Sequence, residues 1–220
     1  MHTKRTVFFD LDGTLINSLP DLLAALNALL AKYKVAPIPS EKAKHYFQHS
    51  SSHILKKLFS DSDHNLEVLI KECFKLYEAR LTCETKLYPG IEKVLMHLDD
   101  ANIPWGVVTN KPYFLAEPLL RHFNLIDRSI CLVCPETVDK PKPHPDPLLH
   151  ACQLANITPS DAIYVGDTLA DIGAAKAANI PLVLACYGFL PDYRTLKQEV
   201  SYHIQAPVEL INVLRSVNSA

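Results

Sequence analysis

The feature that most constrains the fold of this 220-residue chain is an alternation of short apolar runs and helical patterns that is broken once. The apolar runs lack polar alternation, which is typical of strands buried on both faces of a parallel sheet. The expected strands are Thr6–Phe9, Trp105–Val108, Ile130–Val133, Ala162–Val165 and Leu182–Ala185. The expected helices between them span about 89–101, 112–123, 146–156 and 168–178. This order predicts an α/β fold with a doubly wound, Rossmann-like parallel sheet.

The interval from about Leu19 to Thr85 breaks the alternation, because it has helical periodicity and no strand candidate. Leucines at positions 22, 26, 29 and 30, for example, recur at helical spacing. About sixty-five helical residues after the first strand predict an inserted all-α domain that packs over the strand ends. We therefore expect an α/β core formed by residues 1–15 and 86–220, and a helical cap formed by residues 16–85.

Composition and charge limit the partners that this chain can have. The net charge of −2 gives no basic surface for nucleic acid, and 48% hydrophobic with 21% charged residues is ordinary for a globular protein. The apolar run after the basic N-terminus ends at Asp10, too early for a signal peptide or a membrane span. We expect a cytoplasmic protein with no nucleic-acid or membrane partner, present as a monomer or weak homodimer.

The strongest local signal is the segment Asp10-Leu-Asp-Gly-Thr14, directly after the first expected strand. Open α/β sheets bind ligands at the carboxyl ends of their strands, so Asp10 and Asp12 arrive where a site is expected. Gly13 allows a tight turn that a side chain would obstruct. An Asx-turn would account for the Asp-Gly pair alone, but it leaves Asp10 unexplained.

Polar residues also follow two later strands and lie in one loop. Thr109-Asn110 follows the strand at 105–108, and Asp167 follows the strand at 162–165, with Asp171 one helical turn further on. Thr109 alone is equally consistent with an ordinary strand end, and both aspartates are consistent with helix capping, which is compatible with metal binding. In the proline-rich loop, Lys142 is preferred to Lys140 because Lys142 opens a Lys-Pro-x-Pro segment.

Together these four ordered motifs resemble those of the haloacid-dehalogenase-type phosphohydrolases, and the helical insertion after the first motif resembles the phosphoglycolate-phosphatase branch. The resemblance covers the whole chain apart from the insertion. It implies hydrolysis of a small phosphomonoester through an aspartyl-phosphate, with Mg²⁺ as cofactor. Carboxylate oxygens are suitable ligands for Mg²⁺, which also bridges to substrate phosphate oxygens.

The resemblance also implies a role for each motif residue. Asp10 is the expected nucleophile, and Asp12 is the expected general acid and base. The expected Mg²⁺ ligands are Asp10, Asp167 and Asp12, the last through its main-chain carbonyl, with Asp171 supporting the metal or orienting Lys142. The phosphate is expected to be held by Thr109, Lys142, Asn110 through its backbone amide, Gly13 and Thr14.

The nature of the substrate is left with alternatives. Phosphoglycolate is the first expectation, but segments such as 105–112 and 142–147 also resemble the N-acetylmuramic acid 6-phosphate phosphatases. A non-catalytic phosphate-binding protein is the alternative of a different class, although Asp10, Asp12 and Lys142 are all present. A haloacid dehalogenase is disfavoured, because halide displacement needs neither Asp12 nor a metal ligand at 167.

Two further groups of residues could take part in metal or redox chemistry, but each also has a simpler interpretation. His45, His49 and His53 are four residues apart and suit a transition metal, but we expect them to line the substrate face of the cap or to be solvated. In the same segment His49, Ser50 and Ser52 replace the glycines usual in related caps, and we expect them to contact substrate. The Cys131-x-x-Cys134 pair is expected to be reduced and buried rather than redox-active or zinc-binding.

Overall fold

The computed structural model describes residues 5–60, 63–190, 196 and 200–217. The chain divides into two compact units. Residues 1–17 with 87–220 form the first, which we call the α/β unit, and residues 18–86 form the second, which we call the helical unit. The chain therefore enters the helical unit once, after the first strand, and leaves it once.

The α/β unit contains a six-stranded sheet in which every neighbouring pair is parallel. The strands are β1 (Thr6–Phe9), β4 (Trp105–Val108), β5 (Leu132–Val133), β6 (Ala162–Gly166), β7 (Leu182–Ala185) and β8 (Tyr202–Ile204). Their spatial order is β5-β4-β1-β6-β7-β8. This is the order of a Rossmann sheet, in which the chain reverses direction across the sheet between β1 and β6. The expected fold class is confirmed.

The register of the central strands brings their carboxyl ends together. Phe9 is paired with Val107 on β4 and with Val165 on β6. The residues that follow these positions therefore lie side by side at one edge of the sheet. Because β1 and β6 flank the point where the strand order reverses, a ligand site is expected between their ends.

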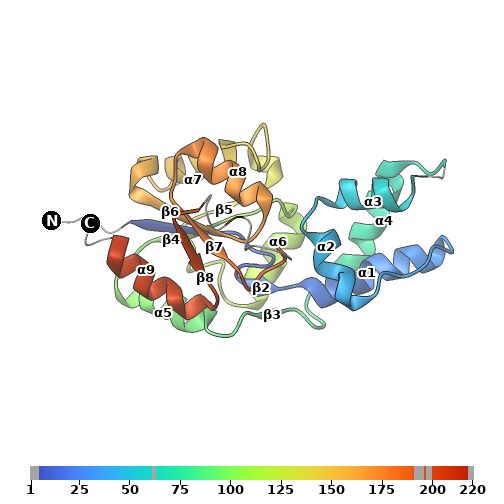
Figure 1. Cartoon of the computed structure of the whole chain (residues 1–220), viewed down its shortest axis with the longest axis horizontal. Helices are drawn as coiled ribbons and strands as arrows, with labels where there is room; N and C mark the ends of the chain where they lie inside the picture. Colours follow the sequence, from blue (N-terminus) through green and yellow to red (C-terminus); the bar gives the residue numbers. More distant parts are fainter. Residues whose placement is uncertain (1–4, 61–62, 191–195, 197–199, 218–220) are drawn as a thin grey trace. The chain divides into compact units, whose positions relative to one another are not determined.

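Helices cover both faces of this sheet. They are α5 (Ile91–Asp100), α6 (Tyr113–His122), α7 (Asp146–Leu154), α8 (Leu169–Ala178) and α9 (Leu210–Val217). Helices α7 and α8 lie together on one face, whereas α5 and α9 lie on the opposite face (Figure 1). This two-sided cover explains why the strand residues of β1, β4 and β6 are all buried.

The helical unit has its own hydrophobic core. Its helices are α1 (Leu19–Lys32), α2 (Ala43–Phe47), α3 (Ser51–Leu58) and α4 (Leu66–Glu78). Leu26, Leu29 and Leu30 of α1 pack with Leu55 of α3 and Leu69 of α4. These leucines recur at three- and four-residue spacing, so each helix presents one apolar face to the others. No strand occurs among the described residues between 19 and 85.

The structure differs from the expected elements at the sheet edges and at the joins between units. The edge strand β5 is shorter than the expected 130–133, and β8 and α9 were not expected. The eight residues of α9 mix leucine with β-branched residues, and periodicity cannot assign so short an apolar run. Two further short strands, β2 (Ile16–Asn17) and β3 (Lys86–Leu87), pair where the chain passes between units.

The remaining short elements are 3₁₀ turns at Ser40–Lys42, Pro135–Thr137, Pro159–Asp161 and Pro207–Glu209. All six cysteines are free thiols, and Cys131 and Cys134 are buried. Burial raises the pKa of both thiols to about 12, so neither is a thiolate near neutral pH. Among the described helices, none combines the length and apolar composition that a bilayer crossing requires.

Candidate active site

Asp10 follows β1 directly and is buried at the carboxyl end of the sheet. Its backbone N–H donates to the carbonyl of Val165 over 2.8 Å, which continues the ladder between β1 and β6 by one step. The chain then turns through Gly13, whose φ is +86°. A Cβ atom at this position would lie 2.1 Å from Oδ2 of Asp167, so the turn requires glycine for both conformation and space.

Lys142 provides the cation nearest to Asp10. Its Nζ lies 2.9 Å from Oδ1 of Asp10 and 2.7 Å from Oδ1 of Asp171. Nζ also donates to the hydroxyl of Tyr164 over 2.8 Å and to the carbonyl of Val108 over 3.1 Å. Lys142 is buried whereas Lys140 is exposed, so the second lysine of this loop is the one directed into the site.

The residues after β4 hold the Lys142 loop in place. The side-chain amide of Asn110 donates to the Lys142 carbonyl over 2.9 Å, and its oxygen accepts from the Lys142 N–H over 3.0 Å. Thr109 is buried, and its hydroxyl oxygen accepts the backbone N–H of Lys111. The two hydrogen bonds between the Asn110 side chain and the Lys142 backbone fix the position of Lys142 relative to the end of β4.

Asp167 follows β6 and accepts a hydrogen bond at each carboxylate oxygen. The Thr14 hydroxyl donates to Oδ1 over 2.8 Å, and the backbone N–H of Phe189 donates to Oδ2 over 2.7 Å. The backbone N–H groups of Gly13 and Thr14 donate to the carbonyls of Ile16 and Leu11. Within the described contacts, Gly13 and Thr14 therefore shape the first loop and support Asp167.

Asp171 lies in the first turn of α8, and both oxygens of its carboxylate accept several hydrogen bonds. Its Oδ1 accepts from Lys142 and from the Tyr164 hydroxyl, each over 2.7 Å. Its Oδ2 accepts from the backbone N–H groups of Asp167 and Thr168 and from the Thr168 hydroxyl. The Asp171 carboxylate thus caps α8 and also contacts Lys142, which are the two roles that the sequence left open for it.

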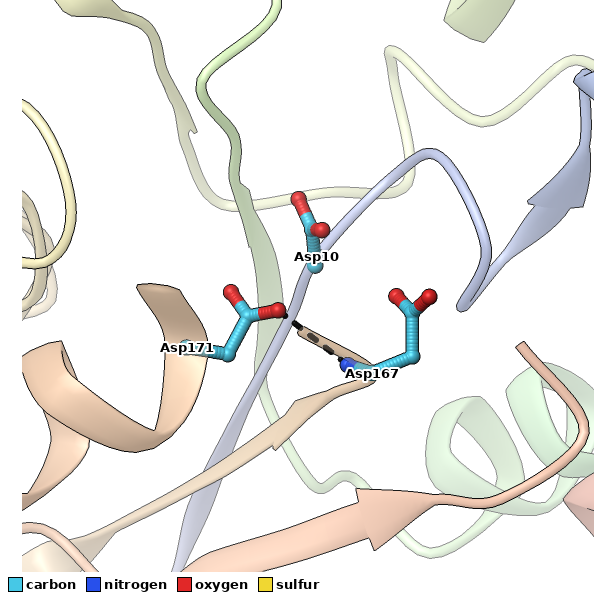
Figure 2. A group of neighbouring side chains, drawn as sticks. All are labelled: Asp10, Asp167 and Asp171. Atoms are coloured by element: carbon cyan, nitrogen blue, oxygen red, sulfur yellow. Dashed lines mark hydrogen bonds between the residues drawn. The ribbon is translucent and has the colours of Figure 1, made fainter. Parts of the chain in front are cut away.

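The three carboxylates of Asp10, Asp167 and Asp171 form one group around a common space. They come from the end of β1, the end of β6 and the first turn of α8, and a hydrogen bond joins Asp171 to the Asp167 backbone (Figure 2). One ligand oxygen from each residue lies within 4.8 Å of the others. This is the only such group of potential metal ligands among the described residues.

Crowding of buried carboxylates shifts their protonation. Burial raises the pKa of Asp10 to about 7; Lys142 opposes this rise and Asp171 adds to it. Burial, together with the charges of Asp10 and Asp171, raises the pKa of Asp167 well above its usual range. For Asp171 burial is the largest influence and acts upward, but the Lys142 ammonium and the hydrogen bonds from Thr168 and Tyr164 together outweigh it and lower the pKa. The site therefore holds more buried carboxylates than its lysine can balance as anions, and a bound cation would favour their deprotonated forms.

The oxygen atoms that these residues offer as ligands suit a Mg²⁺ ion, because hard divalent cations prefer carboxylate and carbonyl oxygens. Oδ1 of Asp10 is buried and has no hydrogen bond, although it is in ion-pair contact with Lys142. The Asp12 carboxylate does not belong to the group of three, since both its oxygens face Lys111. Only its main-chain carbonyl is thus a candidate ligand.

Of the three candidate residues of the helical unit, His49 and Ser50 lie between α2 and α3, and Ser52 lies in the first turn of α3. Ser50 caps α3 by accepting the backbone N–H of His53, and its hydroxyl lies 3.0 Å from that of Ser52. The rings of His49 and His53 are 4.6 Å apart, whereas His45 belongs to α2. The three histidines therefore do not share one helix face. Burial and the neighbouring His53 and His45 lower the pKa of His49.

Several residues of the site were not found from the sequence. The sequence pattern predicts Tyr164 only as a strand residue, yet its hydroxyl contacts both Lys142 and Asp171. Lys111 binds Asp12, and Phe189 binds Asp167 through its backbone. A buried tyrosine needs a partner for its hydroxyl, so Tyr164 in an otherwise aliphatic strand was a usable signal. The backbone contact of Phe189 has no sequence signal.

Comparison with known proteins assigns the chain to a family. The family model of the haloacid dehalogenase-like hydrolases matches residues 7–185. A solved structure from Lactobacillus plantarum superposes with a TM-score of 0.86 at 26% identity and covers 96% of this chain and 99% of that chain. The chain belongs to the haloacid dehalogenase-like hydrolases.

Curated relatives narrow the class. A phosphoglycolate phosphatase of Xylella fastidiosa is 40% identical over 186 residues, which are 84% of this chain and 81% of that protein. An N-acetylmuramic acid 6-phosphate phosphatase of Pseudomonas aeruginosa is 32% identical over 213 residues, which are 96% of this chain and 94% of that protein. Within its family the chain is a phosphoric monoester hydrolase of the phosphoglycolate phosphatase-like branch.

Proposed function

We propose that this protein is a Mg²⁺-dependent phosphatase that hydrolyses a small phosphomonoester through a phosphorylated Asp10. The observation that carries the proposal is the buried Asp10 carboxylate, in contact with Lys142 and grouped with Asp167 at the carboxyl end of the sheet. A phosphomonoester dianion repels an anionic nucleophile, so its approach requires positive charge at the same place. Lys142 supplies one such charge.

When bound, Mg²⁺ supplies a second positive charge that screens the phosphate oxygens. We assign its ligands to the side chains of Asp10 and Asp167 and the main-chain carbonyl of Asp12, with Asp171 acting through Lys142. This assignment is supported by the five donors that already engage Asp171. Those contacts suit a residue that orients its neighbours rather than one that binds the ion.

In the proposed reaction one Asp10 oxygen attacks phosphorus while the hydroxyl of Thr109, the backbone amide of Asn110 and Lys142 hold the phosphate oxygens. Asp12 donates a proton to the leaving alcohol. It then accepts a proton from the water that attacks the Asp10 phosphate, which releases inorganic phosphate, restores the Asp10 carboxylate and returns to Asp12 the proton that it gave to the alcohol. Dividing the displacement into two steps makes each easier than direct hydrolysis.

We infer that the helical unit is a cap that selects the organic part of the substrate, with His49, Ser50 and Ser52 as contact residues. Their exposure in the helical unit supports this inference. Phosphoglycolate is the first candidate substrate, from the relatives at 36–40% identity. N-acetylmuramic acid 6-phosphate is the second, because the relatives of that name match 96% of the chain.

Phosphate release from 4-nitrophenyl phosphate and the two candidates, with and without Mg²⁺, tests the proposed activity. We expect turnover that is lost in excess chelator and restored by Mg²⁺. Binding of phosphate without turnover of any ester would instead favour a non-catalytic phosphate-binding protein.

The role of Asp12 is tested by Asp12→Asn with two leaving groups. General acid catalysis contributes about 10²–10⁴-fold, so traces of activity should remain. The loss should be smaller for an aryl phosphate than for phosphoglycolate, because a phenolate leaves without a proton. Equal losses on both esters would remove Asp12 as the acid.

A further inference from the structure

The site contains a second buried lysine that belongs to none of the four motifs. Lys111 lies two residues after Thr109, and only 4% of its side chain is exposed. Its Nζ lies 3.0 Å from Oδ1 and 2.9 Å from Oδ2 of Asp12. Burying an ammonium is unfavourable unless it is paired, so this contact accounts for the position of Lys111 in the fold.

The two lysines of the site bind different aspartates of the first motif. Lys142 contacts Asp10 over 2.9 Å, and Lys111 contacts Asp12 over 2.9 Å. The residue that is proposed to attack and the residue that is proposed to move the proton therefore have separate cations.

Lys111 is placed by the same short segment that places the phosphate-binding groups. Its backbone N–H donates to the Thr109 hydroxyl oxygen over 3.1 Å, and Asn110 between them is bonded twice to the Lys142 backbone. Residues 109–111 thus connect the end of β4 to Lys142 and to Asp12. A change in the position of this segment would move both cations together.

We propose that Lys111 is a positioning residue whose ammonium holds the Asp12 carboxylate in the orientation from which it reaches the leaving oxygen. This inference rests on the proposed function, in which Asp12 is the general acid and base. The contact to both carboxylate oxygens fixes rotation of the group as well as its distance. Loss of such alignment, by an ångström at the reacting atoms, lowers a rate by about 10²-fold.

The test is Lys111→Met, which keeps an unbranched side chain of similar length and removes the charge. With Mg²⁺ present, we expect kcat for phosphoglycolate, or for the best alkyl phosphate found, to fall about 10–100-fold while KM changes little. For 4-nitrophenyl phosphate the fall in kcat should be several-fold smaller. Lys111→Arg should recover part of the lost kcat. Lys140→Met is the matched control, an exposed lysine of the site loop that should change neither constant.

A double-mutant cycle shows whether Lys111 acts through Asp12. In the Asp12→Asn background, Lys111→Met should cause little further loss, because the group that it orients is already inactive. Multiplicative losses, or a rise in KM with kcat unchanged, would overturn the proposal and indicate direct contact with substrate. Where thermal unfolding shows that the Met variant does not fold, Lys111→Gln takes its place in the same cycle.

The inference and the proposed function fail in distinguishable ways. If Asp12→Asn lowers kcat equally for alkyl and aryl esters, the role of Asp12 is wrong and the inference falls with it. If Asp12→Asn shows the expected dependence on leaving group and Lys111→Met does not, the assignment of Lys111 alone is wrong.

Discussion

The two units of this protein each bury aspartate side chains completely, but they treat the charge in opposite ways. In the helical unit, Oδ2 of Asp21 accepts the backbone N–H groups of Glu84 and Thr85 and the Thr85 hydroxyl, over 2.8–2.9 Å. Its other oxygen lies 3.4 Å from Nε of Arg80. One carboxylate thus faces three hydrogen-bond donors and a guanidinium.

In the α/β unit, three carboxylates share one space and one nearby lysine, and burial raises the pKa of Asp10 and Asp167. Burial of a carboxylate is therefore not by itself a sign of chemistry. The informative property is the ratio of carboxylates to cations: one carboxylate faces one guanidinium at Asp21, whereas the carboxylates of Asp10, Asp167 and Asp171 share the single ammonium of Lys142. Such an imbalance destabilises the fold and is expected where a cation or a reacting group completes the site.

The largest expected difference between the two regions is in activity. Asp10→Asn removes the carboxylate that is proposed to attack, so phosphatase activity should fall by about 10⁴-fold or more. It also removes one of the crowded charges, so the free energy of unfolding should not decrease. Activity assays and denaturant unfolding of the same preparation measure both effects. Substantial turnover, or phosphate trapped on another residue, would overturn the assignment of the nucleophile.

Asp21→Asn is the matched change in the helical unit, and it should lower stability instead. The amide can still accept at one atom, but its NH₂ group would face the Arg80 guanidinium. Breaking this partly buried ion pair, together with the change at the hydrogen-bonded carboxylate, costs about 3 kcal/mol in the free energy of unfolding. Chemical denaturation measures the loss. A variant as stable as the parent would show that the Asp21 contacts contribute little, and the comparison between the two regions would then fail.

The carboxylates at the strand ends could be predicted from the sequence, whereas the contacts of Asp21 and Lys111 could not. Asp10 and Asp167 were found because each directly follows a recognisable buried strand, and parallel strands bring their ends together. Asp21 sits inside a helical pattern, and its partner Thr85 is 64 residues away. Lys111 and Asp12 are 99 residues apart, and a lysine after a strand is usually solvated. Contacts of this kind depend on side-chain packing between elements, which no local pattern records.

The stability of the protein should depend on pH through the carboxylates of the α/β site. The pKa of Asp10 is raised from 3.8 to about 7 in the folded metal-free protein. Between about pH 4 and 7 the folded state therefore keeps a proton that the unfolded chain has released, so the free energy of unfolding falls as pH rises through this window. The raised pKa of Asp167 acts in the same direction. The lowered pKa of Asp171 acts oppositely, but only below its ordinary value of 3.8.

Mg²⁺ should reverse this loss, because it requires the deprotonated carboxylates. At 100-fold excess over Kd the ion stabilises the fold by about 2.7 kcal/mol. For a chain of this size we expect Tm to rise by about 5–10 °C at pH 8 and by much less at pH 5. Asp21→Asn should keep this difference, and Asp167→Ala should abolish it. An equal shift at both pH values would contradict binding by Asp10 and Asp167.

The smallest expected effects come from removing one hydroxyl in each region, and they make the sharpest comparison. Tyr164→Phe deletes the donor to Asp171, which lies 2.7 Å away, and Thr85→Val deletes the donor to Asp21, which lies 2.8 Å away. Both changes nearly preserve shape, and each removes one hydrogen bond to a buried carboxylate. Each should therefore lower the free energy of unfolding by about 1–2 kcal/mol.

Activity should distinguish these two variants although their stabilities are similar. The Tyr164 hydroxyl also accepts from Nζ of Lys142, so its loss leaves this ammonium less constrained beside Asp10 and should lower kcat several-fold. Thr85 contacts no residue of the α/β site among its described hydrogen bonds, so Thr85→Val should retain the parental kcat per folded molecule. Steady-state kinetics well below each variant's Tm make this test. Equal kcat values for the two variants would mean that the Tyr164 hydroxyl contributes to stability only, and that the other contacts of Lys142 suffice to align it.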